Sequence, residues 1–510
     1  MADTYICAAG IQPGMPAAST VSRRRAAPAW NLDPISSRKF ESAESNRLNK
    51  AHWQYADDQS VNVWLASQLS TIRARATYEA RNNPILQGVI KTHADDIVGR
   101  DGPSLQVQSD DDQFNDAAER VWRDWFRSPT TRQNVSGAQM LKLWIRGLWR
   151  SGELLAKIVT DPTVEGPVSM RLRPLHPRNL GTPLELTADP NVVMGIRFNS
   201  LGQPTTYYLA DSTIAGDDLT GLTASLPWPA DLVLHEFVVD EEDQARGIPL
   251  ANAALPTAAD LRDYTAQVQD AARQMADQSC LLYTDHPDAE LWENPESMTV
   301  KRRVIGMVPP GWKPFTYAAT QPPATYETYL AERMREIGRP VGMPLLMVRL
   351  DASRHNYSSA RLDTQVYRRS VAGLQAWLSG TDRSCGALSR LLDIVIAEAR
   401  FAEPALRTRP RQVIYAWTWP VLPHVDPAKE SQAEEQTLAN ATETLTDAVA
   451  ARGHDLETHI ATLVRERQLL IDAGIAPPPW MSGSSPEPEP IDAAAVDEQI
   501  AAAAEEADVE

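Results

Sequence analysis

The chain has 510 residues, of which 43% are hydrophobic and 23% charged. At roughly 150 residues per domain it has room for about three domains. Its composition is that of a globular protein, which excludes wholesale disorder, a collagen-like repeat and a coiled-coil fibre. No run reaches the roughly 18 apolar residues that a membrane span needs, and the N-terminus lacks the apolar core of a signal peptide. We therefore expect a protein without a membrane span that is made in the cytosol.

The net charge is −18, and it is unevenly distributed. Ten acidic residues and no Lys or Arg follow Arg467, so the rest of the chain carries only −8. Tight nucleic-acid binding needs clustered cations that release counterions from the phosphates. The sequence therefore argues against tight binding, whereas transient contact with DNA remains compatible with it.

Motifs for catalysis and for ligand binding are missing from the sequence. It has no GxxxxGK[ST] loop for a nucleotide phosphate and no GxGxxG after a strand. The pair His235-Glu236 lacks the second histidine of a zinc protease, so a strand end is the better interpretation. Cys7, Cys280 and Cys385 have no metal-binding or disulfide spacing and no base positioned beside them. We predict no catalytic residue, no metal site and no cofactor.

The N-terminal part of the chain changes from a flexible arm to helices. Residues 1–45 mix small residues and prolines without apolar periodicity, which predicts a flexible arm. Apolar spacing then predicts helices from Val61 to Val98, with a break at Arg81-Asn82-Asn83-Pro84, and over Gln113–Phe126 and Ala138–Trp149. We place the tryptophans of the last two helices in a core rather than in a ligand cage.

Between Gly152 and Phe237 the sequence changes to short β-prone runs separated by Pro, Gly and Asp turns. The predicted strands are Leu154–Val159, Met194–Phe198, Thr205–Leu209 and Leu232–Val238. This region is predicted to be a β-rich module, so the fold class is α+β, mainly helical.

Two amphipathic helices follow the β-rich module. The first begins at Thr257, with Asp260 at the capping-box position, and the second runs from about Thr325 to Ile337 and stops at Gly338. Between them lies an insert, Leu281–Thr320, with a mixed composition.

After the second of these helices, Met343–Asp351 has the composition of an extended apolar stretch that leads into the loop Ala352–Tyr357. Ser358 is predicted to be the N-cap of another long helix. The remaining predicted elements are a helix over Gly386–Phe401, a strand over Gln412–Trp417, and helices over about Lys429–Arg452 and Asp455–Asp472. They precede Pro477-Pro478-Pro479 and the acidic tail.

Several short motifs occur in an informative order. Asn356-Tyr357-Ser358-Ser359-Ala360-Arg361 follows Asp351-Ala352-Ser353 and opens a long helix. The other motifs are Arg81-Asn82-Asn83, Ile97-Val98-Gly99, Ser151-Gly152-Glu153, Leu175-His176-Pro177, Arg246-Gly247-Ile248-Pro249, Pro310-Gly311, and Asp426-Pro427 with Lys429-Glu430. Each triplet alone is weak. In this order, over about two thirds of the chain, the sequence resembles the lambda family of bacteriophage portal proteins.

The resemblance implies a portal fold with a wing, a stem, a clip and a crown. Subunits of this kind assemble into a ring, typically of twelve, at one vertex of the capsid, through which DNA is packaged and ejected. The implied division is an arm at 1–45, a wing at 46–254, a first stem helix at 255–280, a clip at 281–320, a second stem helix at 321–338, a tunnel loop with a wing helix and strand at 339–428, crown helices at 429–476, and a Pro-rich, acidic, disordered tail at 477–510.

The resemblance also implies which residues meet DNA and protein partners. The DNA-facing candidates in the tunnel loop are Arg349, Arg354, His355 and Asn356. For Arg354 the alternative is an ion pair with Asp351.

The clip candidates, which would face terminase and the head-tail adaptor, are Lys301, Arg302, Arg303 and Trp312. Aromatic and arginine side chains commonly anchor such interfaces, although Trp312 beside two prolines is also compatible with filling a turn. Short basic runs are also common on solvated surfaces.

The implied partners are other copies of the chain, double-stranded DNA passing without sequence specificity, the large terminase subunit, the head-tail adaptor, the major capsid protein and the scaffold. The implied location is the virion, and the host cytoplasm during assembly. An acidic body suits this role, because each cation–phosphate contact would hold back a sliding polyanion.

Two alternatives come from other classes of protein. A DNA- or capsid-processing hydrolase would need a carboxylate cluster or a nucleophile with its base, and the sequence presents neither. Another structural head component, such as a scaffold or a minor capsid protein, would share the acidity. A scaffold, however, is expected to be mostly helical, and the β-rich stretch argues against one.

Overall fold

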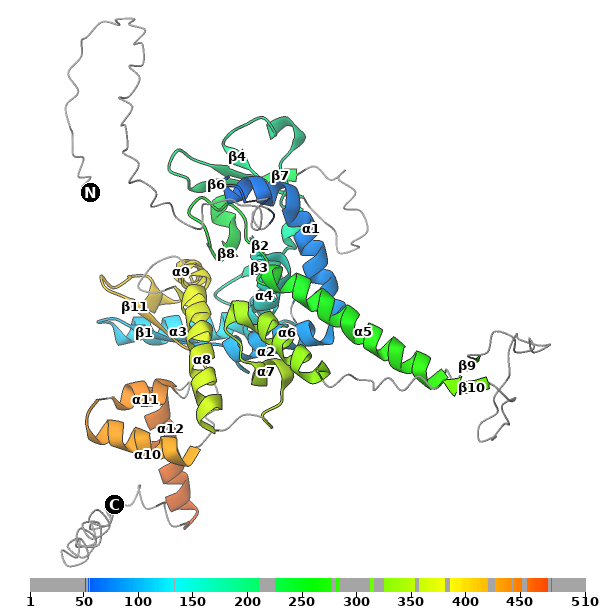
Figure 1. Ribbon diagram of the computed structural model, residues 1–510. Coiled ribbons are helices and arrows are strands. Elements are labelled where there is room, and N and C mark those ends of the chain that lie inside the picture. Colours follow the sequence, from blue (N-terminus) through cyan, green and yellow to red (C-terminus); the bar gives the residue numbers. More distant parts are fainter. Residues whose placement is uncertain are drawn as a thin grey trace, which may run out of the picture. The chain divides into compact units, whose positions relative to one another are not determined.

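The computed structural model describes residues 51, 54, 56–132, 134–210, 225–277, 281–284, 312–315, 325–353, 357–380, 386–420, 427–442, 444–451, 456–475 and 478. Its helices and strands all belong to the compact unit Ser60–Glu510 (Figure 1). The predicted N-terminal arm, most of the predicted clip and the acidic tail lie outside the described residues.

Helices dominate the described part, as predicted. They are α1 (Val61–Asn82), α2 (Pro84–Val98), α3 (Asp112–Phe126), α4 (Gly137–Ser151), α5 (Leu255–Asp277), α6 (Tyr326–Gly338), α7 (Leu345–Arg349), α8 (Tyr357–Ser379), α9 (Ala387–Ala399), α10 (Pro427–Ala439), α11 (Leu445–Ala451) and α12 (Leu456–Asp472). Short 3-10 turns include η2 (Pro177–Asn179), η5 (Asn252–Ala254) and η6 (Arg339–Val341).

The strands form four small antiparallel sheets. The strands are β1 (Ser104–Gln108), β2 (Glu153–Thr160), β3 (Met170–Pro174), β4 (Val192–Val193), β5 (Ile196–Phe198), β6 (Pro204–Ala210), β7 (Ser225–Pro229), β8 (Val233–Phe237), β9 (Leu281–Thr284), β10 (Trp312–Phe315) and β11 (Ile414–Thr418). Strand order is β3-β2-β8 in one sheet and β4-β5-β6-β7 in another, and β1 pairs with β11 and β9 with β10. The first two sheets confirm the predicted β-rich module.

One large apolar core joins α1, α2, α3, α4, α8 and α9, and its largest fully buried side chains include Trp149, Tyr367 and Phe114. The tryptophans Trp122 and Trp125 of α3 and Trp144 and Trp149 of α4 are buried in this core, as predicted. A second, smaller cluster lies at the two larger sheets and contains Leu155, Leu180, Ile196, Tyr207, Leu209 and Val233.

The predicted break between α1 and α2 is confirmed, and its cause is local. Asn83 has extended backbone angles, and its side chain accepts hydrogen bonds from the backbone N–H groups of Ile85 (3.1 Å) and Leu86 (3.3 Å). Pro84 occupies the first helical position, where no backbone N–H is needed. The Asn-Pro pair therefore ends one helix and starts the next.

Four local predictions are wrong. The helix predicted to begin at Thr257 begins at Leu255, so Thr257 lies inside it and bonds Glu336 through its hydroxyl (3.2 Å) instead of capping the helix. Helix α8 begins at Tyr357, so Ser358 is inside that helix and is not its N-cap.

The other two errors concern the type and the number of secondary-structure elements. Residues Leu345–Arg349 form the short helix α7 rather than an extended stretch. The chain turns at Gly338 and Gly342, and the residues after Pro344 are good helix formers. The single helix predicted over Lys429–Arg452 is two, α10 and α11, since Ala441 adopts a positive φ of 53° and breaks it.

Candidate functional site

The segment that would carry the tunnel loop is held by a group of packed helices. α6 contacts both α5 and α7, and α2 contacts α6, α7 and α8. The chain therefore reaches the predicted loop from α7 and leaves it along α8, with both helices packed against α2 (Figure 1).

Helices α5 and α6 meet through an aromatic contact. The ring of Tyr264 lies 4.7 Å from that of Tyr329, edge to face, and 5.9 Å from that of Tyr326, measured between centroids. At its N-terminal end α5 is also tied to α1 and α2, because Arg262 pairs with Glu79 and the Asn83 side chain donates to the backbone oxygen of Ala258 at 3.0 Å. These contacts fix the start of α5 more firmly than its middle.

The turn between α6 and α7 requires glycine at a close approach. A Cβ added to Gly338 would lie 2.4 Å from the backbone oxygen of Met343 and 2.8 Å from a methyl group of Val348. Gly342 has a φ of 69°, in the left-handed region. The backbone thus folds back on itself, and α7 packs directly under the end of α6.

Arg349 is the one tunnel-loop candidate whose side chain lies among the described residues. Its guanidinium lies 3.7 Å from the carboxylate of Glu327 on α6 and 4.0 Å from that of Asp351, and a quarter of the side chain is exposed. The next residue, Leu350, is 81% exposed and adopts a left-handed φ of 54°. The positive charge at this point is therefore balanced, and the exposed tip beside it is apolar.

The other site candidates are mostly outside the described residues. Arg354, His355 and Asn356 lie there, so their role and the alternative pairing of Arg354 with Asp351 remain predictions. Lys301, Arg302 and Arg303 lie there too. Trp312 opens β10, where its backbone pairs with Thr284 of β9.

Helix α8 is anchored by a buried polar network. The Tyr367 hydroxyl donates to the Asp96 carboxylate at 2.8 Å, and Trp149 Nε1 donates to His93 Nδ1 at 2.9 Å. Burial lowers the pKa of His93 to about 4, so the ring is neutral at pH 7. Burial raises the pKa of Asp96, and the hydrogen bond from Tyr367 partly opposes that rise. The helix after the predicted loop is thus fixed to α2, which is itself bonded to α4.

A second organised region is the junction where three of the sequence motifs meet. Gly152 and Gly247 approach so closely that a Cβ on either would lie within 2.5 Å of a backbone oxygen of the other. Arg246 donates from Nη2 to the backbone oxygen of Pro177 at 3.0 Å. Residues almost a hundred positions apart in the sequence therefore form one backbone contact.

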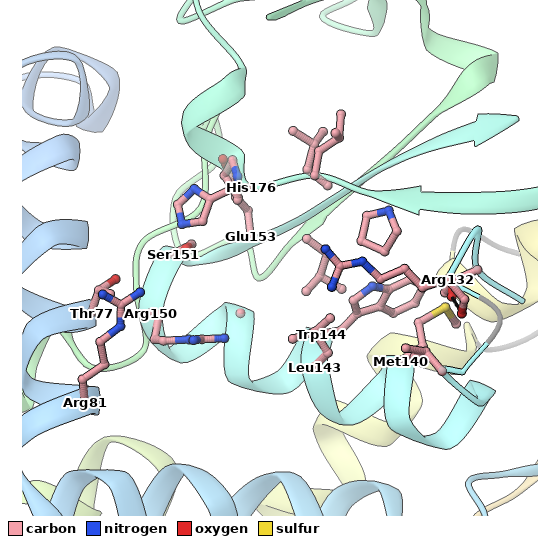
Figure 2. A pocket seen from close by; sticks show the side chains of 18 residues that line it. Thr77, Arg81, Arg132, Met140, Leu143, Trp144, Arg150, Ser151, Glu153 and His176 are labelled. Atoms are coloured by element: carbon pink, nitrogen blue, oxygen red, sulfur yellow. Dashed lines mark hydrogen bonds between the residues drawn. The ribbon is translucent and has the colours of Figure 1, made fainter. Parts of the chain in front are cut away.

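The charge at this junction is centred on Glu153, whose side chain is fully buried. Arg246 donates from Nε to both carboxylate oxygens at 3.0 Å, Arg73 lies 2.7 Å away, and His235 lies 3.1 Å away. Burial alone would raise the pKa of Glu153, but Arg246 and His235 outweigh it and hold the pKa well below its usual range. Figure 2 shows Glu153 beside Ser151 at the end of α4.

Sequence reasoning identified these motifs but not their convergence. Ser151-Gly152-Glu153, Leu175-His176-Pro177 and Arg246-Gly247 were recognised only by their order. The sequence did contain a chemical signal. Glu153 and Arg246 carry opposite charges that can pair when buried, and Gly152 and Gly247 allow two backbone segments to approach closely.

The comparison with known families decides the identity. Residues 46–375 match the family described as phage portal protein, lambda family. That match covers more than half of the 510 residues. The chain belongs to the lambda family of phage portal proteins.

Two phage portal proteins are similar to this chain over most of its length. The portal protein of Escherichia phage N15 is 22% identical over 480 residues, covering 84% of this chain and 89% of that protein. The probable portal protein of Halomonas phage phiHAP-1 is 22% identical over 477 residues, covering 85% of this chain and 89% of the relative.

The solved structures that align with this chain have lower sequence identity to it. A chain from the neck of an empty gene transfer agent particle aligns with 16% identity and a TM-score of 0.45, covering 76% of this portal protein and 91% of that chain. An HK97 family phage portal protein from Corynebacterium diphtheriae aligns with 11% identity and a TM-score of 0.29, covering 70% and 96%.

Family membership makes this portal protein a component of the virion, in which such proteins form a ring around the path of the DNA. The matched segment contains both the Glu153 junction and the Arg349 region. Among the described residues, no helix is long and apolar enough to cross a membrane, and no three His, Cys, Asp or Glu side chains gather as metal ligands.

Proposed function

We propose that α5 and α6 are the stem helices of the portal ring, that residues 350–356 face its DNA channel, and that the elements before α5 form the wing. The observation that carries this proposal is the anchoring of the predicted loop at both ends, on α6 and α2 through α7 and on α2 through α8. A loop that contacts moving DNA needs such a rigid base.

The charge distribution near Arg349 supports a channel wall that does not retain DNA. Arg349 faces Glu327 and Asp351, and the exposed neighbour Leu350 carries no charge. Each unbalanced cation would add a salt-dependent hold on the phosphates. Balanced charge at the loop base therefore permits contact with DNA without retention.

The same proposal covers the partners and the remaining segments. The clip at 281–320, with Lys301, Arg302, Arg303 and Trp312, would bind terminase during packaging and the head-tail adaptor later. The wing would face the capsid protein and scaffold, and α10 to α12 would contribute to the crown. Assembly would take place in the host cytoplasm, and we expect no enzymatic activity from the chain itself.

Electron microscopy of the purified full-length chain tests the ring and the channel together. A closed heterologous interface produces a hollow ring, and about twelve chains of 56.3 kDa would have a mass of roughly 680 kDa. We expect the exposed end of α7, at Leu350, to point to the ring axis. A monomer or dimer that persists at high concentration, or a ring with Leu350 at its outer rim, would contradict the proposal.

A clip variant tests the docking role separately. Replacing Lys301, Arg302 and Arg303 by Ala is expected to weaken terminase binding to the intact ring, measured by co-sedimentation. Lys91, Arg75 and Arg123 are exposed cations of α2, α1 and α3, and replacing all three by Ala provides a matched control. Equal terminase binding by both variants would remove the clip assignment without affecting the ring.

A further inference from the structure

Two adjoining recesses beside the Glu153 junction are lined by cationic side chains. One has a volume of about 290 Å³ and lies between α4, β2 and the start of η2. The other, of about 730 Å³, follows α1 and shares Thr77, Arg81 and His176 with the first. Figure 2 shows Arg81 from α1, Arg150 from α4 and His176 around one end of the smaller recess.

The cations of this pair of recesses, which we call the arginine pocket, exceed its anions. The pocket is lined by Arg73, Arg81, Arg132, Arg150, Arg178 and Arg246. Glu153 is the one carboxylate in its lining, and it is already occupied by Arg73 and Arg246. In the part of the chain that the structure describes, no carboxylate lies within ion-pair distance of Arg81, Arg150 or Arg178.

These unneutralised charges repel one another. Burial lowers the pKa of Arg150, and the nearby charges of Arg81 and Arg146 lower it further. His176 is kept neutral, with a pKa lowered to about 4 by burial and then by Arg178. Its Nδ1 accepts a hydrogen bond from the backbone N–H of Arg178 at 3.1 Å, which leaves Nε2–H as a donor. The pocket therefore offers donors and positive charge, and its one carboxylate, Glu153, is already paired with Arg73 and Arg246.

The opposite end of the smaller recess is mostly apolar. Met140, Leu143 and Trp144 of α4 line it away from Arg81 and Arg150, and Figure 2 shows Arg132 beside Trp144 and Met140. Leu143 is 43% exposed, so an apolar group that enters the recess can cover it. A ligand that fits both ends carries negative charge and apolar side chains in one segment.

We propose that the arginine pocket binds the acidic C-terminal segment of this chain, residues 487–510, from the same or a neighbouring copy. This segment has nine Asp and Glu residues and no Lys, Arg or His, and Ile491, Val496 and Ile500 lie among them. Carboxylates would pair with Arg81 and Arg150, and apolar side chains would cover Leu143 and Trp144. The site is independent of the channel assignment.

A segment of the chain matches the pocket better than duplex DNA does. The guanidinium groups line recesses, which a DNA duplex cannot enter as easily as a single peptide segment can. The phosphates of DNA would also make no apolar contact with Leu143 and Trp144. A tethered segment also binds at a high effective concentration without a separate encounter. Binding of the tail would conceal positive charge that would otherwise hold DNA on the portal surface.

Photo-crosslinking of the full-length protein identifies the occupant directly. Replacing Leu143 by p-benzoylphenylalanine places the reactive group at the apolar end of the pocket. Arg467 is the last Lys or Arg, so trypsin releases residues 468–510 as one peptide. We expect that peptide to be crosslinked from position 143 but not from position 201, where Leu201 is exposed and outside the pocket lining.

Charge variants provide a second test of the proposal. The receptor is a full-length protein in which all nine acidic residues from Glu487 to Glu510 are amides, and the probe is a labelled peptide of the natural 487–510 sequence. Substituting Arg81→Gln with Arg150→Gln is expected to weaken peptide binding by about tenfold, measured by fluorescence anisotropy. The matched control, Arg75→Gln with Arg123→Gln, removes two exposed arginines outside the pocket and is expected to leave binding unchanged.

Each outcome decides the proposal. A 468–510 crosslink specific to position 143, together with binding that depends on Arg81 and Arg150, supports it. Equal crosslinking from both positions, or peptide binding that the pocket variant does not change, overturns it. If a 30-base-pair duplex or inorganic phosphate binds through Arg81 and Arg150 and the peptide does not, the pocket has a phosphate ligand and the tail assignment is wrong. The peptide-binding result does not depend on whether a ring forms.

Discussion

Two arginine–carboxylate contacts in this portal protein differ in almost every physical respect. Arg246 makes two hydrogen bonds of 3.0 Å to Glu153, and both side chains are almost completely buried. Arg349 lies 3.7 Å from Glu327, and a quarter of the arginine and nearly half of the glutamate side chain are exposed. The first contact joins the start of β2 to the loop after β8, where Arg73 of α1 also reaches Glu153. The second lies at the base of the predicted channel loop.

The difference shows where this fold is fixed and where it can adapt. A buried, fully bonded ion pair tolerates little movement, because breaking it leaves an uncompensated charge in a medium of low polarity. An exposed pair at 3.7 Å exchanges with water at little cost. The Glu153 junction therefore holds the module together, whereas the Arg349 pairing can be broken and remade at the base of the proposed channel loop.

The largest expected effect is at the junction itself. Replacing Glu153 by Gln leaves Arg73 and Arg246 buried without a counter-charge and should lower the free energy of unfolding by about 3 to 5 kcal/mol. Denaturant unfolding followed by circular dichroism measures this change. As a control, Glu185→Gln alters an exposed residue of the same region and should change stability little. A loss below about 1 kcal/mol for Glu153→Gln would show that the junction is not an anchor.

A second buried group should make stability depend on pH. His93 has a pKa of about 4 in the folded protein against 6.5 for the free side chain, so the unfolded chain binds a proton first as the pH falls. This contribution is complete above pH 6.5 and is lost toward pH 4, with about 2.5 kcal/mol lost by pH 4.5. Glu153 contributes stability above its unfolded pKa of 4.5 that is lost only at lower pH, so the two can be separated.

Unfolding measured at intervals from pH 7 to 4.5 tests the His93 contribution. His93→Gln keeps an acceptor for Trp149 and should flatten the profile over this range. His176→Gln is measured alongside it, because His176 also has a pKa lowered to about 4, and its share of the slope must be separated from that of His93. The same slope in the His93 variant and in the unmodified protein would assign the pH dependence to another group.

Local sequence signals predicted most of the helices but not how distant parts meet. Asn83-Pro84 specified the α1–α2 break, since capping depends on a few adjacent residues. The strand Met170–Pro174 was missed, because its pairing with β2 and its burial come from distant segments. The Glu153 junction was missed for the same reason, and α7 because the turn before it depends on the close approach at Gly338.

An intermediate effect is expected where α8 is tied to α2. Tyr367→Phe removes the hydroxyl that donates to Asp96 at 2.8 Å in a largely buried site. The unmet carboxylate should cost about 1.5 kcal/mol at pH 7. Tyr415→Phe removes a comparable but exposed 3.2 Å bond to Asp393 and is the matched control. Equal losses in thermal or denaturant unfolding would mean that burial does not distinguish the two bonds.

The smallest effect is expected at the exposed pair, and it completes the comparison. Arg349→Gln should reduce the free energy of unfolding by less than about 0.5 kcal/mol, because solvent already competes for both partners. Raising the salt concentration from 50 mM to 500 mM should remove most of that small difference, whereas the loss in Glu153→Gln should persist, since salt screens buried pairs weakly. Arg262→Gln is a useful intermediate, because its partner Glu79 is only 6% exposed. If Arg349→Gln were as destabilising as Glu153→Gln, the base of the proposed channel loop would be a rigid anchor, and any part that yields to DNA would have to lie beyond Leu350.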